Sequence, residues 1–177
     1  MKKLETLGRC ERAVIDERRV GYGAVARFAA YEATLRALVG RLLPDVRASI
    51  DVAAFVDGHA DHTLGRGDRK AGLPPVADLL EQGLQALTKR GFADSDAAEQ
   101  DALIGRLRRG EADDALGFAA KEFVDRLLVL ACAGYLAHPD AWERIGFNGP
   151  AYPEGYAWIS KGAAARRHDG FVGAARL

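Results

Sequence analysis

The sequence is poor in cysteine, since only Cys10 and Cys132 occur among its 177 residues. Two thiols can form neither a disulfide framework nor a four-ligand metal site by themselves. We therefore interpret both as unpaired thiols. Cys132 lies in the most apolar stretch of the chain, where burial makes a thiol unreactive, so we do not expect it to be a nucleophile.

The sequence also lacks an excess of charge of either sign, because 25 basic residues balance 25 acidic ones. Proteins that bind nucleic acids draw much of their affinity from clustered lysines and arginines. No block of one sign is present here. The charge distribution therefore argues against a nucleic-acid partner.

Long apolar runs are absent as well. The longest uncharged apolar run, Leu127 to Ala137, would rise only about 16 Å as a helix, whereas the hydrocarbon core of a bilayer is about 30 Å thick. Charged residues follow Lys2 and Lys3 where a secretory signal would be apolar, and no long apolar run follows Arg18 and Arg19. We expect no membrane span, no export signal and a cytoplasmic protein.

What the sequence does contain is helical periodicity. From Phe28 to Leu42, apolar residues recur at spacings of three and four, which places them on one face of a helix that Pro44 ends. A second stripe runs from Val76 to Leu87, after Pro75 and before Gly91. Both stripes predict helices that pack against a partner surface.

Two further helices are predicted towards the carboxyl terminus. Asp96 stands three residues before Glu99, the spacing of a capping box at a helix start. The longest segment, from about Ala112 to Ala137, is apolar all round after Arg126, so we expect this end to be the most buried part of the fold. Short helices are also expected within residues 4–20 and 46–58.

No segment alternates apolar and polar residues over the length of a strand, so little or no sheet is expected. The sequence predicts an all-α, single-domain bundle of about five to seven helices, followed by an irregular segment. Residues 1–27 would form a helical extension, residues 28–160 the domain and residues 161–177 a tail.

The irregular segment begins after His138 and combines aromatic residues with glycine and proline. Such a segment cannot form a helix, yet it is too aromatic for a solvated linker, so its rings should pack on the domain itself or on another protein. Both alternatives remain open at this point. The candidate partner-binding residues are Trp142, Phe147, Pro150, Tyr152, Pro153, Tyr156 and Trp158.

One cluster has the residue types of a metal site: Asp57, His59, Asp61 and His62 lie within six residues. Neutral imidazoles bind transition metals, but the spacing is not that of a zinc protease helix, and a polar helix end is the alternative interpretation. The serines lack the glycine-flanked turn that exposes a nucleophile. We expect no catalytic residue, and no cofactor bound by this chain.

Several phrases of the sequence, read together, resemble the gluconate 2-dehydrogenase subunit 3 family. They span about Phe28 to Trp158, and the most specific is the aromatic segment from His138 to Tyr156. The other phrases run from Ala33 to Pro44, from Asp51 to Asp57, and through Gly83–Leu84, Phe92 and Gln100–Leu103.

The resemblance implies a non-catalytic small subunit of a bacterial oxidoreductase complex. Its partner would be a large FAD-dependent dehydrogenase subunit of the glucose-methanol-choline type, acting on a sugar or polyol, with a cytochrome c subunit in some complexes. Family members often carry a twin-arginine signal and export the large subunit with them, so periplasmic location by co-export is the alternative to a cytoplasmic one.

Two other functions remain as alternatives. The chain would be a transient assembly or export chaperone if it bound the flavoprotein only during folding. It would be a small metal-dependent helical enzyme if His59 and His62 held a metal ion. The second alternative requires both histidines to be available to a ligand.

Overall fold

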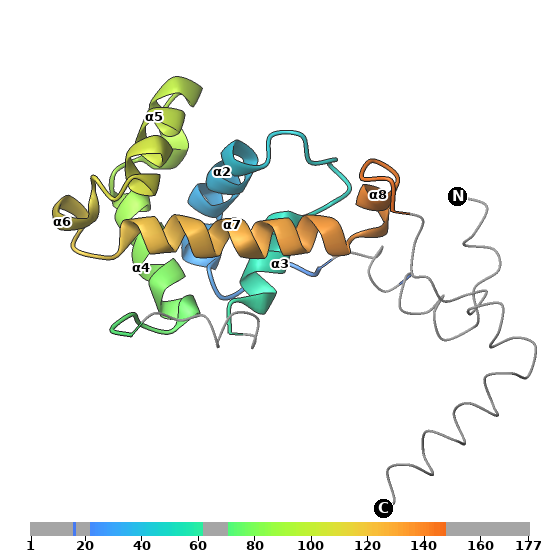
Figure 1. Cartoon of the computed structure of the whole chain (residues 1–177), viewed down its shortest axis with the longest axis horizontal. Helices are drawn as coiled ribbons and strands as arrows, with labels where there is room; N and C mark the ends of the chain where they lie inside the picture. Colours follow the sequence, from blue (N-terminus) through green and yellow to red (C-terminus); the bar gives the residue numbers. More distant parts are fainter. Residues whose placement is uncertain (1–15, 17–21, 62–70, 148–177) are drawn as a thin grey trace, which may run out of the picture. The chain divides into compact units, whose positions relative to one another are not determined.

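The computed structural model describes residue 16 and residues 22–61 and 71–147 (Figure 1). Within these ranges every regular element is a helix, which confirms the all-α prediction. The chain divides into two compact units, of which the first is Gly21–His138. Its helices are η2 (Ala29–Tyr31), α2 (Glu32–Leu42), α3 (Val52–His59), α4 (Val76–Lys89), η4 (Phe92–Asp94), α5 (Ala97–Arg108), α6 (Asp113–Leu116) and α7 (Ala120–Ala137).

Local signals place most helix ends where the sequence predicts them. α2 ends at Leu42, two residues before Pro44, and α4 begins directly after Pro75. Gly91 adopts a left-handed conformation with φ of 70° just beyond α4, which glycine does without the steric cost that other residues carry. The Asp96 side chain accepts a hydrogen bond from the Glu99 N–H at 2.9 Å, so Asp96 caps α5.

The longest helix, α7, is the centre of the first unit. It packs against α3, α4 and α5, and more lightly against α2 (Figure 1). Phe123, Leu127 and Ala131 on its inner side have no exposed surface. The apolar stripes of α2 and α4 supply the other side of the core, since Leu35 of α2 and Leu80 of α4 also have no exposed surface.

The prediction of a single helix from about Ala112 to Ala137 is wrong in one respect, because the structure divides this segment into α6 and α7. Gly117, with φ of 73°, ends α6 in the left-handed region. The Asp113 carboxylate then accepts the Ala120 N–H at 3.1 Å and so satisfies a free donor at the start of α7. The break changes the direction of the chain before the central helix begins.

The predicted burial of the second half of α7 is also only partly right. Val129 is 57% exposed and Leu136 47% exposed, and Cys132 between them is partly exposed rather than buried. A helix that is apolar all round can bury only the faces that other helices cover. In α7 those are the faces that carry Leu127, Leu130 and Ala131.

Two glycines allow α7 to approach its neighbours closely. A Cβ atom on Gly83 of α4 would lie 2.3 Å from the Phe123 ring, and one on Gly134 of α7 would lie 2.7 Å from the Phe55 ring of α3. Neither distance is compatible with non-bonded carbon atoms, which prefer about 3.5–4.0 Å. The aromatic rings of the core therefore occupy the space that any other residue would need.

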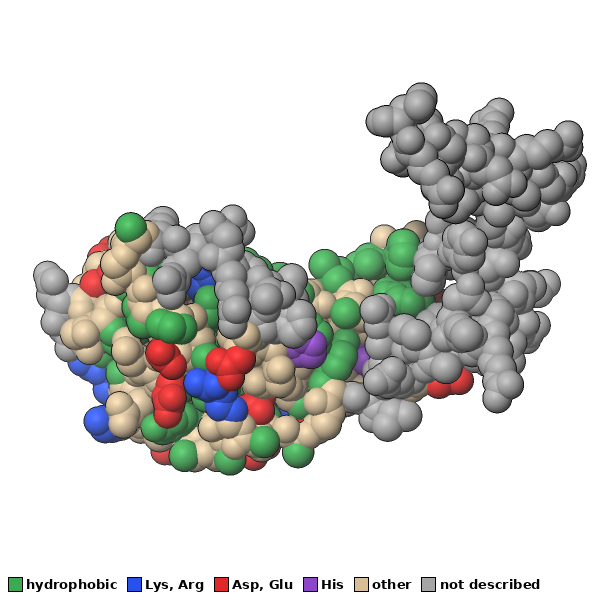
Figure 2. All heavy atoms as spheres, turned by 90° about the horizontal axis from the view of Figure 1, so that it is seen from below, with side chains coloured by type: hydrophobic (Ala, Val, Ile, Leu, Met, Phe, Trp, Pro, Cys, Tyr) green, Lys and Arg blue, Asp and Glu red, His purple; other side chains and the backbone are tan. Residues whose placement is uncertain are grey.

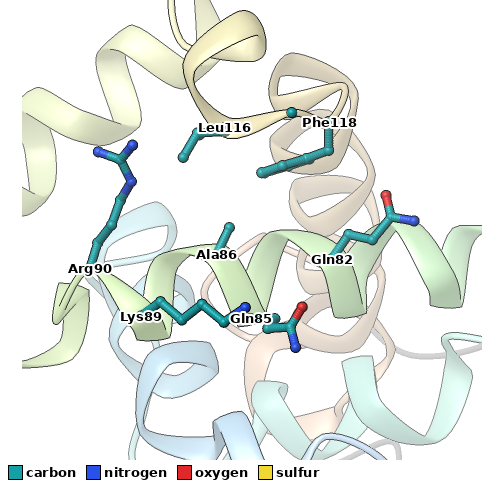
Figure 3. A pocket seen from close by; sticks show the side chains of 8 residues that line it. Gln82, Gln85, Ala86, Lys89, Arg90, Leu116 and Phe118 are labelled. Atoms are coloured by element: carbon teal, nitrogen blue, oxygen red, sulfur yellow. The ribbon is translucent and has the colours of Figure 1, made fainter.

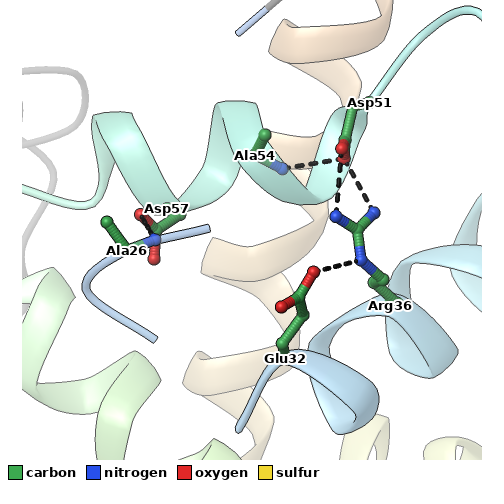
Figure 4. Close-up of polar contacts among 6 residues, drawn as sticks. All are labelled: Ala26, Glu32, Arg36, Asp51, Ala54 and Asp57. Atoms are coloured by element: carbon green, nitrogen blue, oxygen red, sulfur yellow. Dashed lines mark hydrogen bonds and ion pairs between the residues drawn. The ribbon is translucent and has the colours of Figure 1, made fainter. Parts of the chain in front are cut away.

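Acidic and basic side chains stand beside one another on the surface, as on the face seen in Figure 2. Arg27 pairs with Asp61, and Arg41 with Asp101. Arg36 donates two hydrogen bonds of 3.0 Å to Asp51 and one of 2.8 Å to Glu32 (Figure 4). In each of these pairs a positive charge lies beside a negative one, which reduces the field that either charge would produce alone.

Asp51 is expected to make stability depend on pH. Partial burial alone would raise the pKa of this carboxyl, but the hydrogen bonds from Arg36 and from the Ala54 N–H outweigh burial and lower the pKa below 3.8. A lowered pKa in the folded state contributes stability above about pH 4, which is lost as pH falls through the folded-state pKa. Asp51→Asn should therefore be less stable than the wild type at pH 6, and the difference should shrink as pH falls below about 4 and through the folded-state pKa of Asp51.

The measurement is the free energy of unfolding of both proteins in urea at several pH values. Asparagine retains the ability to cap α3, so the comparison isolates the charge of Asp51. A difference in the free energy of unfolding that did not shrink as pH fell below about 4 would contradict the assignment.

Candidate functional site

The two predicted partner-binding aromatics that the structure describes have different environments. Trp142 is only 6% exposed, whereas Phe147 is 46% exposed. Their rings meet edge to face, with centroids 5.3 Å apart at an interplanar angle of 88°. Trp142 is therefore a packing residue, and Phe147 is accessible. The other five candidates, Pro150, Tyr152, Pro153, Tyr156 and Trp158, lie outside the described residues.

A short helix and a tight turn hold Phe147 in place. The helix is α8 (Pro139–Trp142), in the second unit of the chain. The Phe147 N–H donates to the Trp142 carbonyl oxygen at 2.8 Å, and Gly146 before it has φ of 70°. The same turn carries Ile145, which is 47% exposed. Two large apolar side chains, each about half exposed, thus stand on a backbone that hydrogen bonds constrain.

A second exposed apolar surface lies on α7, which sequence reasoning missed. We call it the α7 stripe and define it by Val129, Cys132, Ala133 and Leu136. Their spacing of three and four residues places them on one side of the helix. The sequence carries a related signal, the absence of charge on every face after Arg126, but that signal alone indicates burial and does not tell which face stays uncovered.

The exposed apolar side chains are concentrated in one part of the sequence. Among the described residues, the exposed large hydrophobics are Val129, Leu136, Ile145 and Phe147, all within a stretch of nineteen positions, 129–147. Val129 and Leu136 belong to the first unit, and Ile145 and Phe147 to the second. Single exposed apolar residues scattered over a surface need no explanation, but neighbouring ones on one element are typical of protein contacts. The candidate functional site is therefore the α7 stripe, and the turn that carries Ile145 and Phe147, which we call the Phe147 turn, is a separate candidate contact.

The candidate metal ligands are engaged in the fold where they are described. The Asp57 carboxylate accepts the N–H groups of Ala26, Arg27 and Phe28 at 2.9, 3.1 and 2.7 Å, and Figure 4 shows it facing Ala26. Asp61 pairs with Arg27. The position of Asp57 at the end of α3 therefore serves to hold the chain that leads into η2 and α2.

His59 also has a structural environment. Its Nδ1 lies 2.9 Å from the Phe55 carbonyl oxygen, and its ring stacks on the Phe55 ring with centroids 3.8 Å apart. Across residues 22–61 and 71–147, no three His, Cys, Asp or Glu side chains gather in a way that could hold a metal ion. His62 lies outside the described residues, so the metal hypothesis stays a prediction.

A family model described as gluconate 2-dehydrogenase subunit 3 matches residues 29–149, more than half of the chain. Neither the search of curated proteins nor that of solved structures gave a match. In the part of the chain that the structure describes, no helix has both the length and the apolar character needed to cross a membrane. The matched residues include α7 and the turn that carries Ile145 and Phe147.

Proposed function

Because the chain belongs to the gluconate 2-dehydrogenase subunit 3 family, we propose that it is the small, non-catalytic subunit of a sugar or polyol dehydrogenase complex. In this role it binds and stabilises the catalytic subunit, which holds the FAD. The family is named for a subunit, and a subunit works within a multi-subunit complex. The observation that supports this role is the α7 stripe, on which Val129 is 57% and Leu136 47% exposed.

Such a subunit acts by burying surface on its partner. A stable contact between two proteins covers about 800 Å² on each side, and each buried Å² of apolar surface contributes roughly 25 cal/mol before the costs of association. Binding to the folded partner and not to its unfolded form stabilises the folded form by mass action. The α7 stripe and the Phe147 turn supply apolar surface of the required kind.

Replacing Val129 and Leu136 together with aspartate is expected to weaken binding to the catalytic subunit at least tenfold. Both side chains are exposed, so the isolated chain should keep its melting temperature, because surface substitutions usually change stability by less than about 0.5 kcal/mol. In a complex, however, each new carboxylate would lose its water without gaining a partner. The measurement is titration calorimetry with the purified flavoprotein, alongside thermal melting of the free chain.

The matched control is Ala48→Asp with Ala98→Asp, which adds the same charge at two exposed positions that are not part of the α7 stripe. The control should bind like the wild type. Equal binding by the α7 variant and the control would show that the α7 stripe is not the interface. A catalytic subunit that reached full activity alone and never bound the wild-type chain would overturn the proposed function itself.

Purification of the active enzyme distinguishes a permanent subunit from an assembly chaperone. If the chain is a subunit, it should remain in the active, FAD-containing enzyme through purification. A chain that bound the flavoprotein during its folding and was absent from the mature active enzyme would be a chaperone instead.

A further inference from the structure

A hollow of about 350 Å³ lies between α4 and the turn that joins α6 to α7 (Figure 3). Its residues all belong to the first unit of the chain. Figure 3 shows Ala86 on the floor, with Arg90 and Gln82 rising from α4 on either side of it and Leu116 and Phe118 facing it across the gap. The hollow is therefore apolar in its middle and polar at both ends.

The cations of this hollow differ from most others in the described residues. Arg27, Arg36, Arg41 and Arg109 all pair with carboxylates. No ion pair to a described residue is formed by Lys89 or Arg90, although both line the hollow. The negative end of the helix dipole explains why cations stand in the last turn of α4, but it neutralises only about half a charge. Positive charge is left over beside the hollow.

The apolar wall of the hollow is fixed in position. The Phe118 ring meets the fully buried Phe123 ring edge to face, with centroids 5.8 Å apart. Gly117 turns the backbone between Leu116 and Phe118, so the two side chains lie along the same wall (Figure 3). A ligand would find this surface formed in advance and would not have to order it.

We infer that the hollow receives an acidic side chain of the catalytic subunit, an assignment that rests on the proposed function. The carboxylate would lie against Arg90, which can offer two parallel N–H donors, and within reach of Lys89. The methylene groups of the same side chain would cover Ala86 and Phe118. A glutamate has the necessary combination of a charged end and a short apolar arm.

The openness of the hollow favours a protein over a free small molecule. Gln82, Gln85, Lys89 and Arg90 are all exposed side chains, whereas a site for a small molecule buries about 70–90% of its ligand. A side chain held on a second protein needs less enclosure, because the rest of the interface anchors it. The hollow thus adds a charged contact to the apolar contact of the candidate functional site.

The test uses a double variant that carries both Lys89→Glu and Arg90→Glu. Its affinity for the purified catalytic subunit is measured by calorimetry and compared with that of the wild type. We expect binding to weaken at least tenfold, and a neutral variant, Lys89→Gln with Arg90→Gln, to weaken less. Rising salt should weaken wild-type binding more steeply than that of the neutral variant. Arg106→Glu with Arg108→Glu is the control, because it reverses the same charge at exposed positions on α5 outside the hollow.

The outcomes separate this inference from the proposed function. If the wild-type chain binds the catalytic subunit and the Lys89/Arg90 reversal binds equally well, the inference is wrong and the proposed function stands. Binding of free glutamate to the wild-type chain and to the reversal variant is measured by NMR titration. If the reversal abolishes this binding but leaves binding to the catalytic subunit unchanged, the occupant is a small carboxylate and the inference is again wrong. Failure of the wild-type chain to bind at all overturns the proposed function. Thermal melting confirms that each variant is folded.

Discussion

Replacing Gly83 with alanine is expected to destabilise the folded chain by about 3 kcal/mol, at the upper end for an overpacked core. The added Cβ would lie 2.3, 2.5 and 2.6 Å from three atoms of the Phe123 ring. That ring has no exposed surface and is itself packed against Phe118. Since the ring has nowhere to move, α4 and α7 must separate, and the core between them loses contacts.

At an ordinary glycine within a helix, replacement by alanine changes stability in the opposite direction. Gly40 lies within α2, and a Cβ atom there would meet no atom within 4 Å. Gly40→Ala should therefore stabilise the chain by about 0.5–1 kcal/mol through helix propensity alone. Urea denaturation of both variants measures the contrast. Two variants of equal stability would mean that Phe123 does not fill the space above Gly83.

A second substitution can test the contact itself. Phe123→Leu shortens the side chain that the new Cβ meets, at its own cost in buried area. In the presence of Phe123→Leu, the change Gly83→Ala should cost much less than it does alone. Additive costs would indicate that the two residues do not touch, because residues in contact couple and distant ones do not.

Replacing Asp57 with alanine is expected to cost about 3 kcal/mol of stability, since hydrogen bonds to a charged group contribute about 1.5–3 kcal/mol and the buried Phe28 N–H loses its acceptor. Its carboxylate accepts three successive backbone N–H groups, of Ala26, Arg27 and Phe28. Phe28, the last of them, is fully buried. Without the carboxylate, the segment that places this ring in the core has no polar partner at the end of α3.

Two observations would identify the cause of the loss. Hydrogen exchange at residues 26–28 should accelerate in Asp57→Ala more than exchange within α4, because the protecting acceptor is gone. Asp57→Asn should lose less stability, since its amide oxygen can still accept part of the set. Unchanged exchange at residues 26–28 would show that the carboxylate does not hold this segment.

The parts of the fold that the sequence predicts well depend on neighbouring residues. Pro44, Pro75 and Asp96 are local signals, and the helix ends they mark agree with the structure. The break at Gly117 was missed because a glycine within a helical pattern is often tolerated. Only the left-handed conformation in the folded chain shows that this one ends a helix.

The candidate site was harder to predict because exposure depends on distant parts of the chain. Nothing in the residues around Val129 or Leu136 shows how many helices surround α7. In the same way, Trp142 and Phe147 look alike in the sequence, yet one is buried and the other is not. The role of Asp57 joins residues about thirty positions apart, and no short motif encodes such a contact.

The order of the helices along the chain has a consequence for biosynthesis. α7 is the last helix of its unit, and it packs against α2, α3, α4 and α5, all of which leave the ribosome before it. The core of this unit therefore cannot close until α7 has been made. Because the α7 stripe lies on this last helix, it is displayed on a finished unit, and a protein that bound it would select completed copies over nascent ones.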